Sequence, residues 1–213
     1  MVESLNIWAE PVTPFSPMTA WADLAETVGA APQSVQVSVQ AIDLGLEQGV
    51  AVTCIRLDME SLQCFESVDR QFADWGVVFA NTIAISPSNP SYPAYSGNMV
   101  LMSAPKNGYL EATFLRPASF VSGFVTSSRR AVLTAFDAEN QAIARTETEG
   151  ANLALGADLM EDSGLIAAEN FDKPNHPNAQ LVLSAANIHR ITIHALGGQL
   201  TLDDFCFCLK NEG

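Results

Sequence analysis

Two adjacent aspartates, Asp203 and Asp204, interrupt an otherwise apolar stretch at 199–209, close to the end of the 213-residue chain. A second apolar stretch, at 50–60, also runs into acidic residues. If the two stretches pair as strands, four carboxylates come together: Asp58, Glu60, Asp203 and Asp204. Carboxylate oxygens are the hard ligands that Ca²⁺ prefers. The pattern therefore predicts a structural Ca²⁺ site, and the alternative is that these carboxylates cap strand ends and face solvent.

The same stretch predicts a bulge. Leu200 and Leu202 share one face of a period-2 alternation, whereas Phe205 and Phe207 share the other. The apolar parity switches at the aspartate pair, as it does where a strand carries an extra residue.

A second group of side chains has the chemistry of a sugar site. Sugars bind to an aromatic face flanked by hydrogen-bonding groups, on loops at one rim of a β-fold. The candidates are Trp75, Asn89, Tyr92, Tyr95, Arg129 and Arg130. The alternative is that the tyrosines of the 88–95 loop pack their rings over the core as anchors.

Catalysis has weaker support. A pair of carboxylates can act as acid and base in glycoside hydrolysis, but in a chain with 24 acidic residues some pair is expected by chance. The three histidines, at 176, 189 and 194, have no accompanying Gly-x-Ser-x-Gly or His-x-x-x-His pattern. We expect no enzyme, and a weak glycoside hydrolase is the third alternative for the function.

The composition restricts the partners. A formal net charge of −14 repels nucleic-acid phosphate and anionic lipid, so neither nucleic-acid binding nor membrane insertion is expected. No apolar run approaches a membrane span. The N-terminus lacks the cationic start and apolar core of a secretory signal. Taken as it stands, the sequence predicts a cytoplasmic protein. The alternative is an extracellular protein from which a signal has been removed.

The four cysteines, Cys54, Cys64, Cys206 and Cys208, are too few for a disulfide scaffold in a chain of this length. We expect buried thiols, since free cysteine is among the most buried residue types. A disulfide such as Cys54 to Cys64 is the first alternative, and a tetrathiolate zinc site is the second. Zinc is disfavoured because structural sites use C-x(2–4)-C knuckles rather than the C-x-C pair found here.

Along the chain, residues 1–34 differ from the rest. Ser16 as N-cap, Pro17 at the first helical position and Gly29 as terminator predict a short helix over 17–28. From Val35 the apolar period changes to two. We expect an N-terminal extension over 1–34 and one β-domain over 35–213.

Within that domain the chain alternates short apolar runs with turn residues, which predicts an all-β antiparallel sandwich. Long loops are expected over 61–75 and 150–179. The predicted strands begin at Val35 and continue at 50–60, 76–85, 98–103, 109–115, 119–126, 131–137, 141–147, 180–185, 188–195 and 199–209.

The order of several segments resembles galactose-binding-like jelly-roll domains, including carbohydrate-binding modules of that fold. The segments that carry the resemblance are Leu57-Asp-Met-Glu60, Trp75-Gly-Val-Val-Phe79, Ser96-Gly-Asn-Met-Val-Leu101, Ala112-Thr-Phe-Leu-Arg-Pro117, Val132-Leu-Thr-Ala-Phe-Asp-Ala-Glu-Asn140, Ile188-His-Arg-Ile-Thr-Ile193 and Leu202-Asp-Asp-Phe205.

The resemblance implies a jelly-roll β-sandwich with a structural calcium between the loop after the opening strand and the closing strand. On this chain it points to Glu60 with Asp203 or Asp204, and to Asp58 as an alternate. The function that we expect is non-catalytic binding of carbohydrate. The alternative is a scaffold that uses the same sandwich to hold a protein partner.

Overall fold

The structure is a computed structural model that describes residues 35–42, 50–154 and 177–210. The chain divides into two units between residues 31 and 32, and all described residues belong to the second. The predicted helix at 17–28 lies outside the described residues, as does the middle of the long loop expected at 150–179. Among the described residues, no helix is long and apolar enough to cross a membrane.

The described residues form antiparallel strands and one short 3₁₀ helix, η1, at Ala73–Trp75. The all-β prediction is confirmed for this part of the chain. The strands are β1 (Val35–Ile42), β2 (Val50–Leu57), β3 (Val77–Ala80), β4 (Thr82–Ile85), β5 (Val100–Ser103), β6 (Tyr109–Ser127), β7 (Val132–Phe136), β8 (Ala142–Glu147), β9 (Ala179–His194) and β10 (Leu200–Lys210).

Most strand positions match the sequence prediction, with three differences. The stretch at 76–85 forms two strands, because the chain turns at Asn81, which has a left-handed φ of 60°. The pairs predicted at 109–115 and 119–126, and at 180–185 and 188–195, are each one long strand, β6 and β9. Both long strands carry a register shift where the prediction placed a break, at 113–120 of β6.

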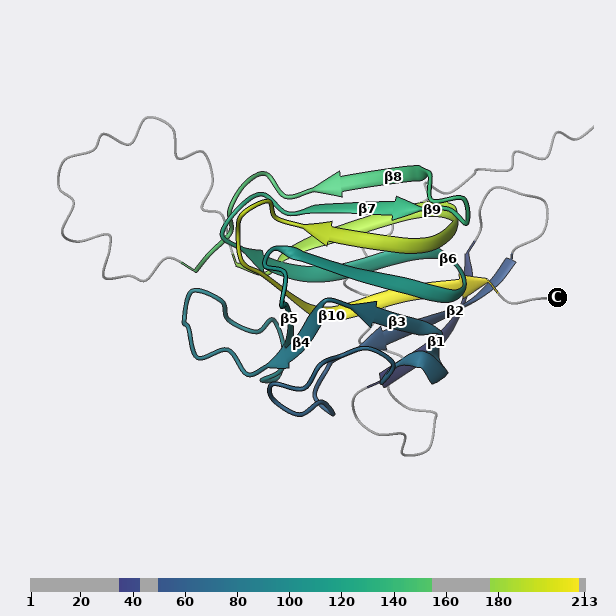
Figure 1. The fold of residues 1–213 in the computed structure, drawn as a ribbon. Coiled ribbons are helices and arrows are strands. Elements are labelled where there is room, and N and C mark those ends of the chain that lie inside the picture. Colours follow the sequence, from purple (N-terminus) through teal and green to yellow (C-terminus); the bar gives the residue numbers. More distant parts are fainter. Residues whose placement is uncertain (1–34, 43–49, 155–176, 211–213) are drawn as a thin grey trace, which may run out of the picture. The chain divides into compact units, whose positions relative to one another are not determined.

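Pairing follows the order β1-β2-β10-β6-β9-β7-β8, with β3 beside β6, β5 beside β10, and β4 beside β5 (Figure 1). The first half of β6 pairs with β3 and with the end of β9, and its second half pairs with β10 and the start of β9. The neighbour of β6 on one side therefore changes from β3 to β10 along its length, and the sheet folds over on itself.

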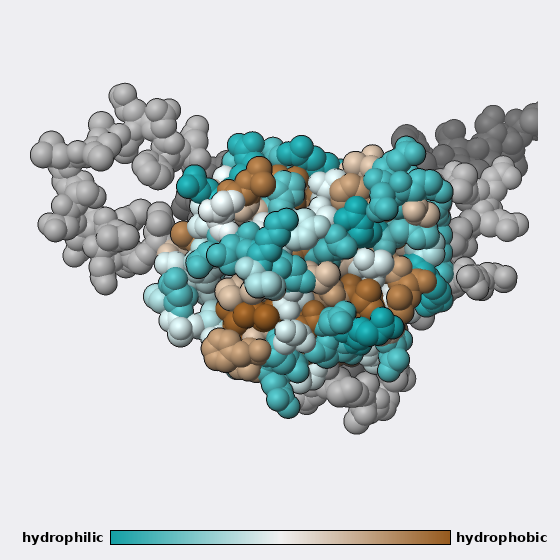
Figure 2. All heavy atoms as spheres, viewed as in Figure 1, coloured by the Kyte–Doolittle hydropathy of each residue, from teal (hydrophilic) through white to brown (hydrophobic). Residues whose placement is uncertain are grey.

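Aromatic side chains fill the space inside the fold. Phe205 of β10 lies 5.5 Å from the ring of Phe79 in β3 and 6.4 Å from that of Phe114 in β6, and Phe207 lies 5.2 Å from Phe114. Strands that are not neighbours thus meet face to face through a buried core, which is the arrangement of a β-sandwich. Figure 2 shows mostly hydrophilic residues on the outside, with apolar residues in small patches.

The predicted bulge in β10 is confirmed. The register between β10 and β6 shifts between Asp203 and Cys206, and Asp204 has a left-handed φ of 46°. Because the bulge reverses the side-chain alternation, leucines before it and phenylalanines after it enter the same core. The core residues that β10 supplies are Leu200, Leu202, Phe205, Phe207 and Leu209.

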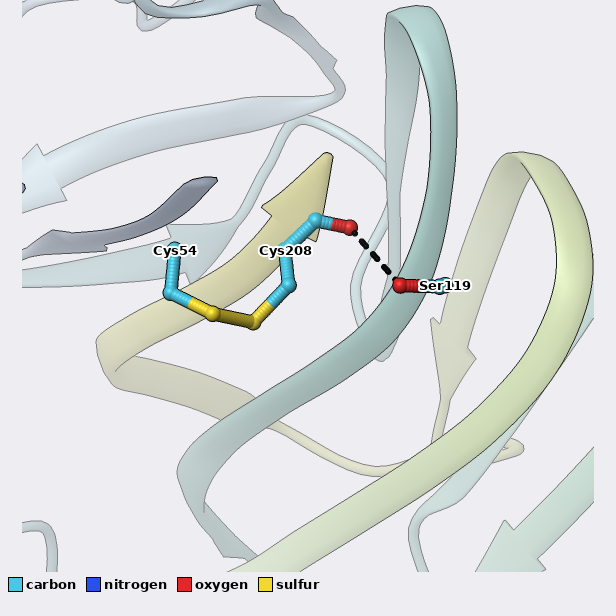
Figure 3. Close-up of a disulfide and its surroundings, with 3 residues drawn as sticks. All are labelled: Cys54, Ser119 and Cys208. Atoms are coloured by element: carbon cyan, nitrogen blue, oxygen red, sulfur yellow. Dashed lines mark hydrogen bonds between the residues drawn. A yellow bond between two sulfur atoms is a disulfide. The ribbon is translucent and has the colours of Figure 1, made fainter. Parts of the chain in front are cut away.

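The cysteines differ from the prediction. Cys54 of β2 and Cys208 of β10 occupy directly opposed positions and form a disulfide (Figure 3). The expectation of four thiols is therefore wrong for these two, and the proposed Cys54–Cys64 pairing is wrong because Cys64 is free and exposed. Cys206 is a buried thiol as expected. The predicted pairing of the two stretches would bring Cys54 near Cys206 and Cys208, and the observed register sets Cys54 opposite Cys208.

The disulfide closes a loop with a sequence separation of 154 residues. Cross-linking so distant a pair restricts the unfolded chain, so the double variant C54S/C208S is expected to lose about 2–5 kcal/mol of unfolding free energy. Chemical denaturation without reductant measures this loss. C64S is the control and should leave the midpoint unchanged. Equal stability of C54S/C208S and the native protein would contradict the assignment.

Candidate functional site

The closing strand β10 exchanges one neighbour for another at the two aspartates. Thr201 and Leu202 pair with β5, whereas the residues from Phe205 onward pair with β2. Asp203 and Asp204 lie between these two pairings and are almost fully buried, at 2% and 3% exposed. The predicted pairing of the closing strand with the opening stretch is confirmed, and it brings the ends of β2 and β5 to the bulge.

Backbone N–H groups of the loop before β5 bind two of the predicted carboxylates. The amides of Tyr95 and Ser96 donate to Oδ2 of Asp203, at 2.7 and 3.0 Å. The amides of Asn98 and Met99 donate to Oε1 of Glu60, both at 2.8 Å. Two carboxylates from distant parts of the chain thereby hold one short segment, 95–99, which we call the clamped loop.

Gly97, at the centre of the clamped loop, has a left-handed φ of +57°. A Cβ atom there would lie 2.3 Å from Oε1 of Glu60. Glycine is therefore required both by the backbone conformation and by the close approach of the carboxylate.

The second aspartate faces a different set of partners. Nη2 of Arg56 donates to Oδ2 of Asp204 at 2.5 Å, and the Ser96 hydroxyl donates to Oδ1 at 3.1 Å. Nη1 of Arg56 also donates to Oε1 of Gln36 at 3.3 Å. The Arg56 side chain is 26% exposed and that of Asp204 is 1% exposed. The guanidinium is therefore the part of this ion pair that reaches the surface, and its charge is neutralised by the buried carboxylate.

Burial governs the protonation of the cluster. It raises the pKa of Asp203 to about 6, although N–H donors favour the ionised form and the neighbouring Asp204 charge adds to the rise. Burial also raises the pKa of Asp58, with smaller contributions from the charges of Glu60 and Asp204. The charges of Glu60 and Asp204 thus act on Asp58, and the charge of Asp204 acts on Asp203.

The oxygens of the aspartate pair already have hydrogen-bond partners within the protein. Both oxygens of Asp203 accept backbone N–H groups, since Oδ1 accepts from Asp204 at 2.7 Å. Both oxygens of Asp204 are bound by Arg56 and Ser96. Among the described residues no group of three or more His, Cys, Asp and Glu side chains is placed to hold a metal, and the Ca²⁺ site stays a prediction.

The clamp also places an aromatic side chain on the outside of the sheet. The Tyr95 ring stacks on Phe124 of β6, with centroids 3.5 Å apart and an interplanar angle of 7°. Phe124 pairs with Asp203 on one side and with Gln180 on the other. Tyr95 nevertheless stays 44% exposed, so its ring is held from below and open to solvent elsewhere.

The other residues predicted for sugar binding are less suitable. Tyr92 is buried, and Trp75 is half-buried against the core. Tyr92 therefore follows the alternative interpretation, that of an aromatic anchor, and Trp75 packs against the core in the same way. Asn89 is exposed, and its side chain caps the backbone of Ser91 at 3.0 Å.

Arg129 and Arg130 follow β6 and are both exposed. Arg130 pairs with Glu147 at 3.2 Å, because Arg130 lies just before β7 and Glu147 ends β8, its antiparallel neighbour. Near them, a pocket of about 320 Å³ is lined by Glu147, Thr148, Glu149, Pro177, Asn178, Ala179 and Gln180.

Sequence reasoning missed Arg56, Phe124, Asn178 and Gln180. One signal was available: Phe120, Ser122 and Phe124 alternate with the core residues of β6, so aromatic rings lie on the non-core face of that strand. Asn178 gave no signal, because its contacts are long-range. Its side chain bonds Thr126 at 3.1 Å and the carbonyl of Ala94 at 3.5 Å.

No protein-family model matches this chain, and no curated protein matches it. Similar solved structures include a DUF4465 family protein from Bacteroides caccae, with 11% identity and a TM-score of 0.36 over 87% of this chain and 91% of that one. A family 29 carbohydrate-binding module has 8% identity and a TM-score of 0.32 over 62% of this chain and 91% of that one. The enzymatically active domain of tailspike protein 4 from bacteriophage CBA120 has 13% identity and a TM-score of 0.24, over 83% and 18%. Similarities of this size assign neither a family nor a function.

The sequence-derived calcium prediction can be tested directly. A Ca²⁺ ion bound only by the native state would raise its stability by about 2.7 kcal/mol at a hundredfold excess over Kd. If the predicted site holds Ca²⁺, the melting temperature should rise with calcium concentration and fall in chelator, and D203N or D204N should abolish the response. A melting temperature that neither calcium, chelator nor substitution changes would contradict the calcium site.

The raised pKa of Asp203 predicts a pH dependence. The folded state takes up a proton at about pH 6, well above the ordinary value of 3.8. The contribution of this group to stability is therefore complete below the unfolded pKa and is lost as the pH rises through 6. The melting temperature of the native protein, minus that of D203N, should increase as the pH falls from 7 to 5. A constant difference would show that Asp203 does not titrate in this range.

Proposed function

We propose that this domain is a non-catalytic carbohydrate-binding module whose ligand lies on the outer face of β10, β6 and β9, beside Tyr95. The observation that carries the proposal is the Tyr95–Phe124 stack, an exposed aromatic ring fixed at the sheet surface. The resemblance of the sequence to galactose-binding-like jelly-roll domains is consistent with this function, and jelly-roll connectivity is part of the proposal.

The Tyr95 ring is suited to a sugar because its position on the sheet is fixed before any ligand binds. Phe124 supports one ring face, and the Tyr95 amide is bonded to Asp203. A pyranose presents a flat face of C–H groups that packs on such a ring. A pre-ordered platform reduces the conformational entropy that binding would otherwise cost.

Polar groups surround the ring at positions where sugar hydroxyls would lie. On one side are Ser96 and the Arg56–Asp204 pair. On the other are the exposed amide of Gln180 and the partly exposed Asn178. A few fixed donors and acceptors beside an aromatic surface are the usual composition of a small-molecule site.

The carboxylates favour binding over hydrolysis. Glycoside hydrolysis needs one carboxyl group to donate a proton and another to act as a base or nucleophile. Each oxygen of Asp203 and Asp204 already accepts a hydrogen bond from the protein itself. These two side chains therefore serve as structural acceptors.

The disulfide supports a location outside the reducing cytosol. Structural disulfides form and persist in oxidising compartments, and Cys54–Cys208 joins two central parts of the fold. We accordingly propose that the module acts in an exported protein.

A glycan array with the native protein tests the proposal, with Y95A as the variant. Binding should fall at least about tenfold in Y95A, which corresponds to about 1.4 kcal/mol or more. F65A is the matched control, because Phe65 is an exposed aromatic residue, 78% exposed, that takes no part in the Tyr95 stack. Absence of glycan binding, together with co-purification of a protein partner, would favour the scaffold alternative.

A further inference from the structure

The face that carries Tyr95 has a second aromatic position. Phe120 lies four residues before Phe124 on the same side of β6, with Ser122 between them. At the rise of an extended strand the two rings are about 13 Å apart along β6. This separation exceeds the width of a single sugar ring.

Phe120 forms an apolar patch with the disulfide. It packs against the cluster of Val52, Cys54 and Cys208. Directly opposed pairing places Phe120 beside Cys208 and on the other side beside Ser184, whose side chain is exposed. The disulfide joins the strands that form this patch (Figure 3).

Between the two aromatic positions the strand residues are closely packed, and Ser122 and Cys206 are buried, at 7% and 4% exposed. Ser122 pairs with Cys206, which in turn pairs with Arg56 of β2. The Ser122 hydroxyl and the Cys206 thiol are hydrogen-bonded to each other, so neither is an unsatisfied group. The Arg56 guanidinium is the partly exposed polar group beside this middle section.

The charges on this face restrict the ligand further. The positive charge of Arg56 is neutralised by Asp204 at 2.5 Å, and the whole chain carries a formal net charge of −14. A polyanionic glycan would be repelled over long range and would find no unpaired cation at Arg56. Stacking surfaces and neutral hydrogen bonds remain as the sources of affinity.

We propose that the ligand of this face is an extended, neutral oligosaccharide that lies along β6 and stacks on both Tyr95 and Phe120. The inference rests on the proposed function and specifies its ligand class. A single sugar covers one aromatic position, and at least two linked sugars are needed to reach both. Affinity should therefore increase with chain length until both rings are covered and then stay constant.

Calorimetry on oligosaccharide series of one to six units tests this inference, with neutral β-linked glucan, mannan, xylan and galactan series and an acidic galacturonan series. For the neutral series that binds, Kd should fall at least about tenfold between the monosaccharide and the tetrasaccharide. F120A should remove this gain, so that its Kd for the tetrasaccharide is close to its Kd for the monosaccharide. F136A is the control, because Phe136 is a half-buried strand phenylalanine that packs under Arg190 in β7–β9.

F120L provides a second variant that keeps most of the apolar volume, in case F120A does not fold. A length-independent Kd, an unchanged gain in F120L, or preferential binding of galacturonan would overturn the inference while leaving the carbohydrate function intact. Failure of every series to bind, neutral and acidic, would instead refute the proposed function itself.

Discussion

The structure depends on the hydrogen bonds that Asp203 and Asp204 accept. These two buried carboxylates lie where the neighbour of β10 changes from β5 to β2. A charged group removed from water is costly unless donors surround it. Asp203 meets this requirement with the amides of Tyr95, Ser96 and Asp204, and Asp204 meets it with Arg56 and Ser96. The exposed Glu60 holds the other end of the clamped loop through the amides of Asn98 and Met99. The same bonds fix the approach to β5 and the end of β2, so the acidic residues that disrupt the apolar pattern are those that join the strands.

The sequence predicted the strands well because period-2 alternation is a local signal. It also predicted the bulge, since the change of parity between Leu202 and Phe205 is visible in the sequence alone. It did not predict that β6 and β9 continue through their irregular middles, because the partners that keep those residues extended lie on other strands. The continuity of these two strands was therefore decided by pairing with distant strands and not by the local sequence pattern.

For the candidate site, the sequence indicated that these carboxylates lie together, and the Ca²⁺ ion stays a prediction. Clustered acidic residues suggest a cation, and the structure adds backbone amides and one guanidinium as partners of the same carboxylates. Backbone donors carry no sequence signature except the glycine that their conformation requires. Gly97 is that residue, and only the structure relates its left-handed φ to Glu60.

The bulge of β10 and the proposed binding face therefore depend on the same hydrogen bonds. Tyr95 is the first residue of the clamped loop, so the carboxylate that satisfies the bulge also sets the position of the exposed ring over Phe124. Arg56 likewise neutralises Asp204 and presents its remaining surface beside that ring. A binding surface supported from strands in this way is held more precisely than one carried by a free loop. The hydrogen bond from the Tyr95 amide to Asp203 therefore links the buried aspartate pair directly to the exposed aromatic ring.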